Sequence, residues 1–155
     1  MKKHGAKIAL VVGGLGLLVL MRFIPRQPVA EKPVSSLEQK IARATELVEK
    51  GENPMEGIQL FREILAEDSN NIEVHYRLGL FSLQSGQVDK AVQRFEKVLS
   101  LSTQTYPDAY LYLGQAKQAL GDTTGAIEAY NTFKTTTSDT IVLHGVDRII
   151  NELSN

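Results

Sequence analysis

A pattern of small and apolar residues occurs twice in this chain, and it constrains the fold more than any other feature. The two copies lie in residues 71–102 and 106–137, about 35 residues apart. The first contains Leu78, Gly79, Gly86, Ala91 and Phe95, and the second contains Leu113, Gly114, Gly121, Ala126 and Tyr130. In each copy the apolar spacing predicts two amphipathic helices joined by a turn. Recurrence at this period indicates an all-α fold of stacked helical hairpins.

The small residues of the pattern are predicted to lie where helices cross or where the chain turns. Gly79 and Gly114 fall in the first helix of each copy, where a side chain larger than a methyl group would push the helices apart. Gly86 and Gly121 fall between the helices, where a left-handed backbone conformation is expected. The pattern therefore specifies helix packing and turns rather than chemistry.

These features resemble the tetratricopeptide repeat, a helical hairpin of about 34 residues that stacks into a solenoid. The resemblance covers residues 37–137, with repeats at about 37–70, 71–104 and 106–137. The first repeat fits more loosely, because the turn around Asn53 and Pro54 is one residue longer than usual, but Gly57 stands where the small residue of the second helix is expected and Phe61 where the aromatic residue is expected. We expect about three repeats, closed by a capping helix in residues 138–155 that covers the last apolar face.

An apolar run precedes the repeats. Residues 8–24 are apolar apart from Arg22, and Lys2, Lys3 and Lys7 lie before them. As a helix these 17 residues measure roughly 25 Å, near the short limit for a bilayer core of about 30 Å. We expect residues 1–24 to form one transmembrane anchor with a basic flank. A cleaved signal peptide and a buried core helix are the alternatives.

A linker rich in proline is expected between this run and the repeats, in residues 25–36. Pro25, Pro28 and Pro33 are spaced too closely for a helix, so the segment should be extended and semi-rigid. Ser35 or Ser36 can then cap the first helix, and Gln39 lies three residues after Ser36, as in a capping box.

The charge is unevenly distributed along the chain. Residues 1–30 contain five basic side chains and no acid, whereas residues 31–155 contain all 18 acids and 12 basic side chains, a net charge of −6. The basic end suits a membrane surface through residues 8–24. The acidic remainder argues against nucleic-acid binding, which requires a basic face.

No constellation of catalytic residues is recognisable. The chain has no cysteine, which excludes disulfides, thiolate metal sites and cysteine nucleophiles. Its three histidines have no acidic neighbours at metal-ligand spacing, and His75 is expected to be a packed helix residue. The sequence predicts no enzyme activity, no cofactor, no metal and no small-molecule substrate.

The resemblance implies a binding surface on the first helices of the repeats, which line a concave face in such solenoids. The side chains expected to contact a protein or peptide partner are Tyr76, Arg77, Leu80, Tyr112 and Gln115. Further positions on that face are Ile41, Thr45, Val48, Leu83, Gln84, Leu111 and Gln118, although burial by neighbouring helices is the alternative for the leucines. The lysine, arginine and asparagine clamp that some members use for a peptide carboxylate is absent, and only Arg77 could supply part of it.

The sequence thus predicts a membrane-tethered adaptor that binds a segment of a partner protein on its solenoid. The alternative is a permanent structural or assembly subunit of a larger membrane complex. The architecture resembles that of small bacterial envelope tetratricopeptide proteins. This resemblance implies a single-pass protein of the inner membrane with its repeats in the periplasm.

Overall fold

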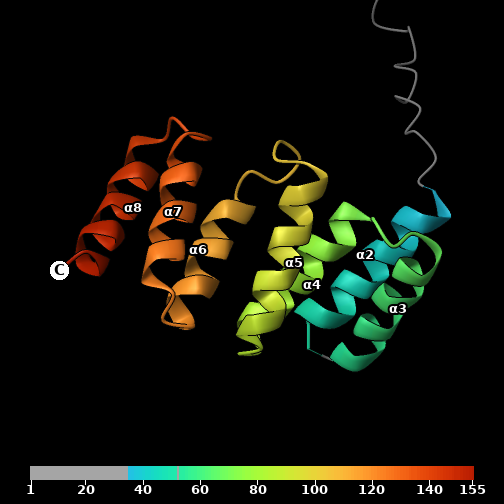
Figure 1. Ribbon diagram of the computed structural model, residues 1–155. Coiled ribbons are helices and arrows are strands. Elements are labelled where there is room, and N and C mark those ends of the chain that lie inside the picture. The colour runs from blue at the N-terminus through green and yellow to red at the C-terminus, as the bar shows by residue number, and fades with distance from the viewer. Residues whose placement is uncertain (1–34, 52) are drawn as a thin grey trace, which may run out of the picture. The chain divides into compact units, whose positions relative to one another are not determined.

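The computed structural model describes residues 35–51 and 53–155, which fold into seven α-helices with no strand (Figure 1). The helices are α2 (Ser36–Glu49), α3 (Pro54–Glu67), α4 (Ile72–Gln84), α5 (Val88–Leu101), α6 (Ala109–Ala119), α7 (Thr123–Lys134) and α8 (Thr140–Leu153). Among the described residues, none of these helices combines the length and the hydropathy of a membrane span. The predicted anchor at residues 1–24, and all of the predicted linker except its last two residues, lie outside the described residues.

The helices form three consecutive hairpins and a last single helix. Helices α2 and α3, α4 and α5, and α6 and α7 pack in pairs, successive pairs are in contact, and α8 packs on α7 (Figure 1). The predicted all-α solenoid of helical hairpins is therefore confirmed for residues 35–51 and 53–155.

Local hydrogen bonds explain where several helices begin. Helix α2 starts with a capping box in which the Glu38 N–H donates to Ser35 Oγ (3.1 Å) and the Ser35 N–H donates to Glu38 Oε2 (2.7 Å). The box is one residue earlier than the expected Ser36–Gln39 pair, because Ser35 is the residue in the extended conformation that a cap requires. Side chains that cap later helices belong to Asn71, Asp122 and Asp139.

Glycine closes the turn inside each hairpin. The backbone is left-handed at Gly51 (φ 68°), Gly86 (φ 73°) and Gly121 (φ 79°). A residue with a Cβ atom is strained in this conformation, so glycine is the residue that ends one helix and lets the next fold back on it.

A close approach at glycine holds the two helices of each hairpin together. A Cβ atom on Gly79 would lie 2.8 Å from the ring of Phe95, and one on Gly114 would lie 2.6 Å from the ring of Tyr130. In the first hairpin a Cβ atom on Gly57 would lie 2.6 Å from the Ala44 carbonyl oxygen. All three crossings need a residue without a side chain.

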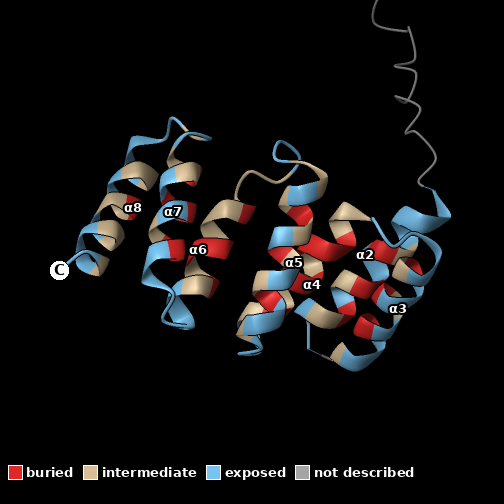
Figure 2. Cartoon of the chain, in the orientation of Figure 1, coloured by how far each residue is buried: buried red, intermediate tan, exposed pale blue. Residues whose placement is uncertain are grey.

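The buried residues, which are red in Figure 2, form three clusters between the helices. The first joins α2 and α3 to α4 and contains Phe61, Ile64, Val74 and Leu78. The second joins α4 and α5 to α6 and contains Tyr76, Phe95, Val98, Ala109 and Leu113. The third joins α7 to α8 and contains Ala126, Tyr130, Phe133 and Val146. Each hairpin is thus stabilised by its neighbours, as in a solenoid.

Candidate functional site

A groove lies along the first helices of the three hairpins, and we call it the α2–α4–α6 groove. Its volume is about 400 Å³. Its lining comprises Thr45, Val48 and Glu49 of α2, Phe61 of α3, Arg77, Leu80, Phe81, Leu83 and Gln84 of α4, and Tyr112 and Gln115 of α6. This surface is mostly apolar with amides and charges at its edge, which is the composition of a ligand or peptide site.

Four of the five expected contact residues line this groove, namely Arg77, Leu80, Tyr112 and Gln115. The fifth, Tyr76, does not line it. Its side chain is turned into the core between the second and third hairpins, where only 8% of the residue remains exposed. The expectation that Tyr76 faces the groove is therefore wrong. Tyr112, which also belongs to a first helix, does line the groove.

Two partners that precede α6 hold Tyr76 in the core. Its hydroxyl donates to Asp108 Oδ2 (2.5 Å), and its ring stacks on Tyr106 with 4.2 Å between the centroids. Burial, and then the bond to Asp108, raises the pKa of the Tyr76 phenol, so it remains a hydrogen-bond donor. Tyr76 therefore fixes the position of α6 relative to α4 and so supports one wall of the groove.

The floor and rim of the groove differ in polarity. Leu80 and Leu83 are only half-buried, so they still offer apolar surface to a ligand. The amides of Gln84 and Gln115 have no hydrogen-bond partner within the described residues. An amide can donate and accept, which suits it to the main chain of a bound peptide.

Arg77 lies at one edge of the groove between two carboxylates that sequence reasoning did not identify. Its guanidinium donates to Glu49 Oε1 (3.5 Å) and Glu73 Oε1 (3.4 Å). Its Nε atom is buried, and no described group accepts a hydrogen bond from it. The carboxylates already neutralise this side chain, so a second anion gains little there. A role for Arg77 as a peptide-carboxylate clamp is therefore unfavourable.

A second depression of about 500 Å³ adjoins this edge and shares Thr45, Glu49 and Arg77 with the groove. Its lining also includes Glu38, Glu46 and Glu73, and one further cation, Lys50, which pairs with Glu46 (2.6 Å). The groove is thus bordered by carboxylates on the side of α2. This border disfavours an acidic ligand in the groove.

The remaining positions expected on this face are used within the fold. Ile41 is buried in the first core cluster, and Leu111 packs against the last one. Gln118 accepts a hydrogen bond from the Tyr130 hydroxyl (2.8 Å). None of these three residues lines the groove.

His75 is packed, as the sequence indicated. It is 6% exposed, with Nε2 2.9 Å from the Ser69 carbonyl oxygen and Nδ1 2.9 Å from Arg94 Nη1. Because a guanidinium can only donate, Nδ1 accepts and Nε2 carries the proton, so the ring is neutral. Burial is the main cause that lowers the pKa of His75. The described residues contain no group of three or more histidines and acids that could hold a metal ion.

Comparisons with known proteins agree with this architecture. Sequence models of the tetratricopeptide repeat match residues 52–100 and 108–136. A solved structure of a MamA mutant is similar over 90% of this chain and 75% of its own, with a TM-score of 0.65 and 21% sequence identity. No curated protein matches the sequence. The two repeat matches and the stacked hairpins together show that the chain belongs to the tetratricopeptide-repeat family.

Proposed function

We propose that this protein is a non-enzymatic adaptor that binds a segment of a partner protein in the α2–α4–α6 groove. The groove itself carries the proposal, because a depression of about 400 Å³ with an apolar floor is formed by all three first helices. Membership of a family that binds proteins on such surfaces supports it.

The lining suggests which chemistry the segment has. Apolar side chains would rest on Leu80, Leu83 and Tyr112, while the amides of Gln84 and Gln115 pair with its main chain. The carboxylates beside Arg77 favour a neutral or basic segment over an acidic one. Burial of two or three apolar side chains of the segment supplies most of the binding free energy.

The second part of the proposal is a membrane tether in residues 8–24. Its support is the apolar run with three lysines before it. In this proposal the chain spans the bacterial inner membrane once and holds the repeats in the periplasm. Tethering raises the effective concentration of a bound partner near other membrane components.

Site-specific crosslinking tests the groove. A photoreactive amino acid at Gln115, within the groove, should crosslink a partner segment in native membranes, and mass spectrometry should locate it to one stretch of the partner. The same probe at Gln93, an exposed residue of α5 that does not line the groove, is the matched control. Leu80→Glu, which places a charge on the groove floor, should abolish the Gln115 crosslink.

Two outcomes would contradict the proposal. Equal crosslinks from Gln115 and Gln93 would mean that the groove is not the preferred site. A Gln115 crosslink that survives Leu80→Glu, with helicity unchanged by circular dichroism, would mean that the apolar floor does not bind the segment. Sizing after detergent extraction distinguishes the alternative, because a permanent subunit stays in a large particle whereas an adaptor is recovered near its own mass.

A further inference from the structure

A cationic cleft lies away from the groove, between α3 and α5 with α4 as its floor, and we call it the α3–α5 cleft. Its volume is about 210 Å³. Three basic side chains line it, Arg62 from α3 and Lys90 and Arg94 from α5, and none of its lining residues is acidic. The only residue it shares with the α2–α4–α6 groove is Phe81.

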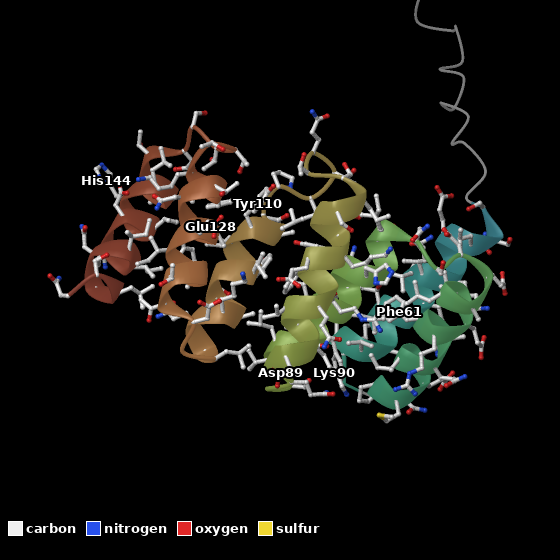
Figure 3. The ribbon with its side chains drawn as sticks, viewed as in Figure 1. Phe61, Asp89, Lys90, Tyr110, Glu128 and His144 are labelled. Carbon is white, nitrogen blue, oxygen red and sulfur yellow. The ribbon has the colours of Figure 1, made fainter. Side chains whose placement is uncertain are left out.

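The three cations of this cleft have no carboxylate partner among the described residues, in contrast to Arg77 in the groove. Lys90 donates to the Gln87 amide oxygen (2.6 Å), and Arg94 donates to the neutral His75 ring (2.9 Å). Asp89 precedes Lys90 at the start of α5 but does not line the cleft (Figure 3). Burial and then the charge of Arg62 lower the pKa of Arg94, so these two guanidinium groups repel each other.

Such a cluster is unusual in a stretch as acidic as residues 31–155, whose net charge is −6. The remaining lining is apolar except for Ser82 and Gln87. Ile58, Leu78 and Phe81 form the inner surface, and Met55 stands at the cleft with 65% of its area exposed. A ligand that matches both the unpaired cations and the apolar inner surface carries carboxylates next to an apolar side chain.

We propose that the α3–α5 cleft binds an acidic segment of a protein, at a site separate from the α2–α4–α6 groove. Arg62 and Arg94 come from two different hairpins, so the segment also bridges them. Guanidinium groups bind carboxylates through paired, charge-assisted hydrogen bonds, and both the cations and the carboxylates are compensated in the complex. The adaptor then has two binding surfaces of opposite preference, one acid-bordered and one cationic.

The test uses the full-length chain in nonionic detergent and a fluorescent peptide, acetyl-Glu-Leu-Glu-Glu-Leu-Glu-amide, with the Gln-for-Glu peptide as its counterpart. We expect the acidic peptide to bind with an affinity that falls as salt rises, and the glutamine peptide to bind at least about tenfold more weakly. The double variant Arg62→Gln/Lys90→Gln removes two exposed charges and should weaken binding about tenfold.

Matched controls separate this site from overall charge. Arg43→Gln/Arg148→Gln makes the same change in net charge at exposed positions outside the cleft, and should alter affinity less than about twofold. Leu80→Glu in the groove should leave acidic-peptide binding unchanged, so the two sites can fail independently. In NMR spectra the peptide should shift the imidazole signals of His75, which contacts Arg94, and spare those of His144 on α8, far from the cleft (Figure 3).

Three results would overturn the proposal. One is equal binding of the acidic and glutamine peptides. Another is an equal loss in the cleft and control double variants. The third is binding to vesicles of phosphatidylglycerol through Arg62 and Lys90 without any binding of the peptide, which would assign the cleft to a lipid surface.

Discussion

The first hairpin and the two that follow it use glycine in different ways where their helices cross. In the second and third hairpins a glycine of the first helix, Gly79 or Gly114, faces an aromatic ring of the second helix. In the first hairpin the glycine is in the second helix, and Gly57 faces the carbonyl oxygen of Ala44 and the side chain of Val48. In the first hairpin, backbone therefore packs against backbone. In the second and third hairpins, backbone packs against a side chain, which a mutation can shorten.

The largest effect is expected at the backbone crossing. Gly57→Ala places a methyl carbon 2.6 Å from the Ala44 carbonyl oxygen, which cannot move without moving α2. We expect a loss of about 3 kcal/mol in the free energy of unfolding, measured with urea by circular dichroism.

Gly145→Ala is the control for this substitution. It adds the same methyl group within helix α8, where nothing lies within 4 Å of the new atom. It should stabilise the protein by up to about 1 kcal/mol through helix propensity. A Gly57→Ala variant as stable as the wild type would mean that the first hairpin tolerates a wider crossing.

A smaller loss of stability is expected where a glycine faces an aromatic ring, and a second substitution that shortens the ring residue should offset part of it. Gly79→Ala brings a methyl carbon 2.8 Å from Phe95 and should cost about 2 kcal/mol. In the double variant with Phe95→Leu the two losses should be less than additive, with a favourable coupling of about 1 kcal/mol.

The corresponding double variant of the first hairpin, Gly57→Ala/Val48→Ala, should show little coupling. Shortening Val48 leaves the Ala44 carbonyl oxygen in place. Equal coupling in the two double variants would remove the distinction between the backbone crossing and the ring crossing.

The smallest expected effect is a pH dependence of the unfolding free energy, and it distinguishes the second hairpin from the third. His75 occupies the place in α4 that Tyr110 occupies in α6, and its pKa is lowered in the folded protein. The unfolded chain therefore binds a proton at His75 more readily than the folded protein does. The neutral His75 ring thus contributes stability that is complete above the ordinary pKa of 6.5 and is lost as the pH falls toward the pKa of the folded protein. The slope is at most about 1.4 kcal/mol per pH unit.

Unfolding free energies measured between pH 7.5 and pH 5.5, roughly the range in which histidine titrates, will show this slope. His75→Gln should flatten it, because the amide can still donate to the Ser69 carbonyl and accept from Arg94 without titrating. His144→Gln, at an exposed residue, should leave the slope as it is. The same slope in wild type and His75→Gln would assign the pH dependence to other groups.

The sequence predicted the parts of the fold that depend on local geometry. The roles of Gly79 and Gly86 follow from the spacing of residues along two helices, and such spacing can be counted without knowing the rest of the molecule. Four of the five proposed groove residues, which the resemblance to the repeat family implied, line the groove.

The parts that depend on contacts between hairpins could not be predicted. The burial of Tyr76 results from Tyr106 and Asp108, which lie in the connection before α6, about 30 residues along the chain. The α3–α5 cleft brings Arg62 next to Arg94 from another hairpin. The rotation between successive hairpins decides both contacts, and no residue spacing specifies it.

The hydrogen bond between Tyr76 and Asp108 also has a mechanical consequence for the groove. It ties α4 to the start of α6 through a buried donor and a stacked ring, so the wall that carries Tyr112 is stiff. On the opposite side, among the described residues, α4 and α2 share the 3.5 Å ion pair of Arg77 with Glu49, and the first hairpin otherwise packs on α4 through the apolar cluster that contains Phe61 and Val74. One wall of the groove is therefore held by a buried, directional hydrogen bond, whereas the other is held mainly by apolar packing, which is less directional.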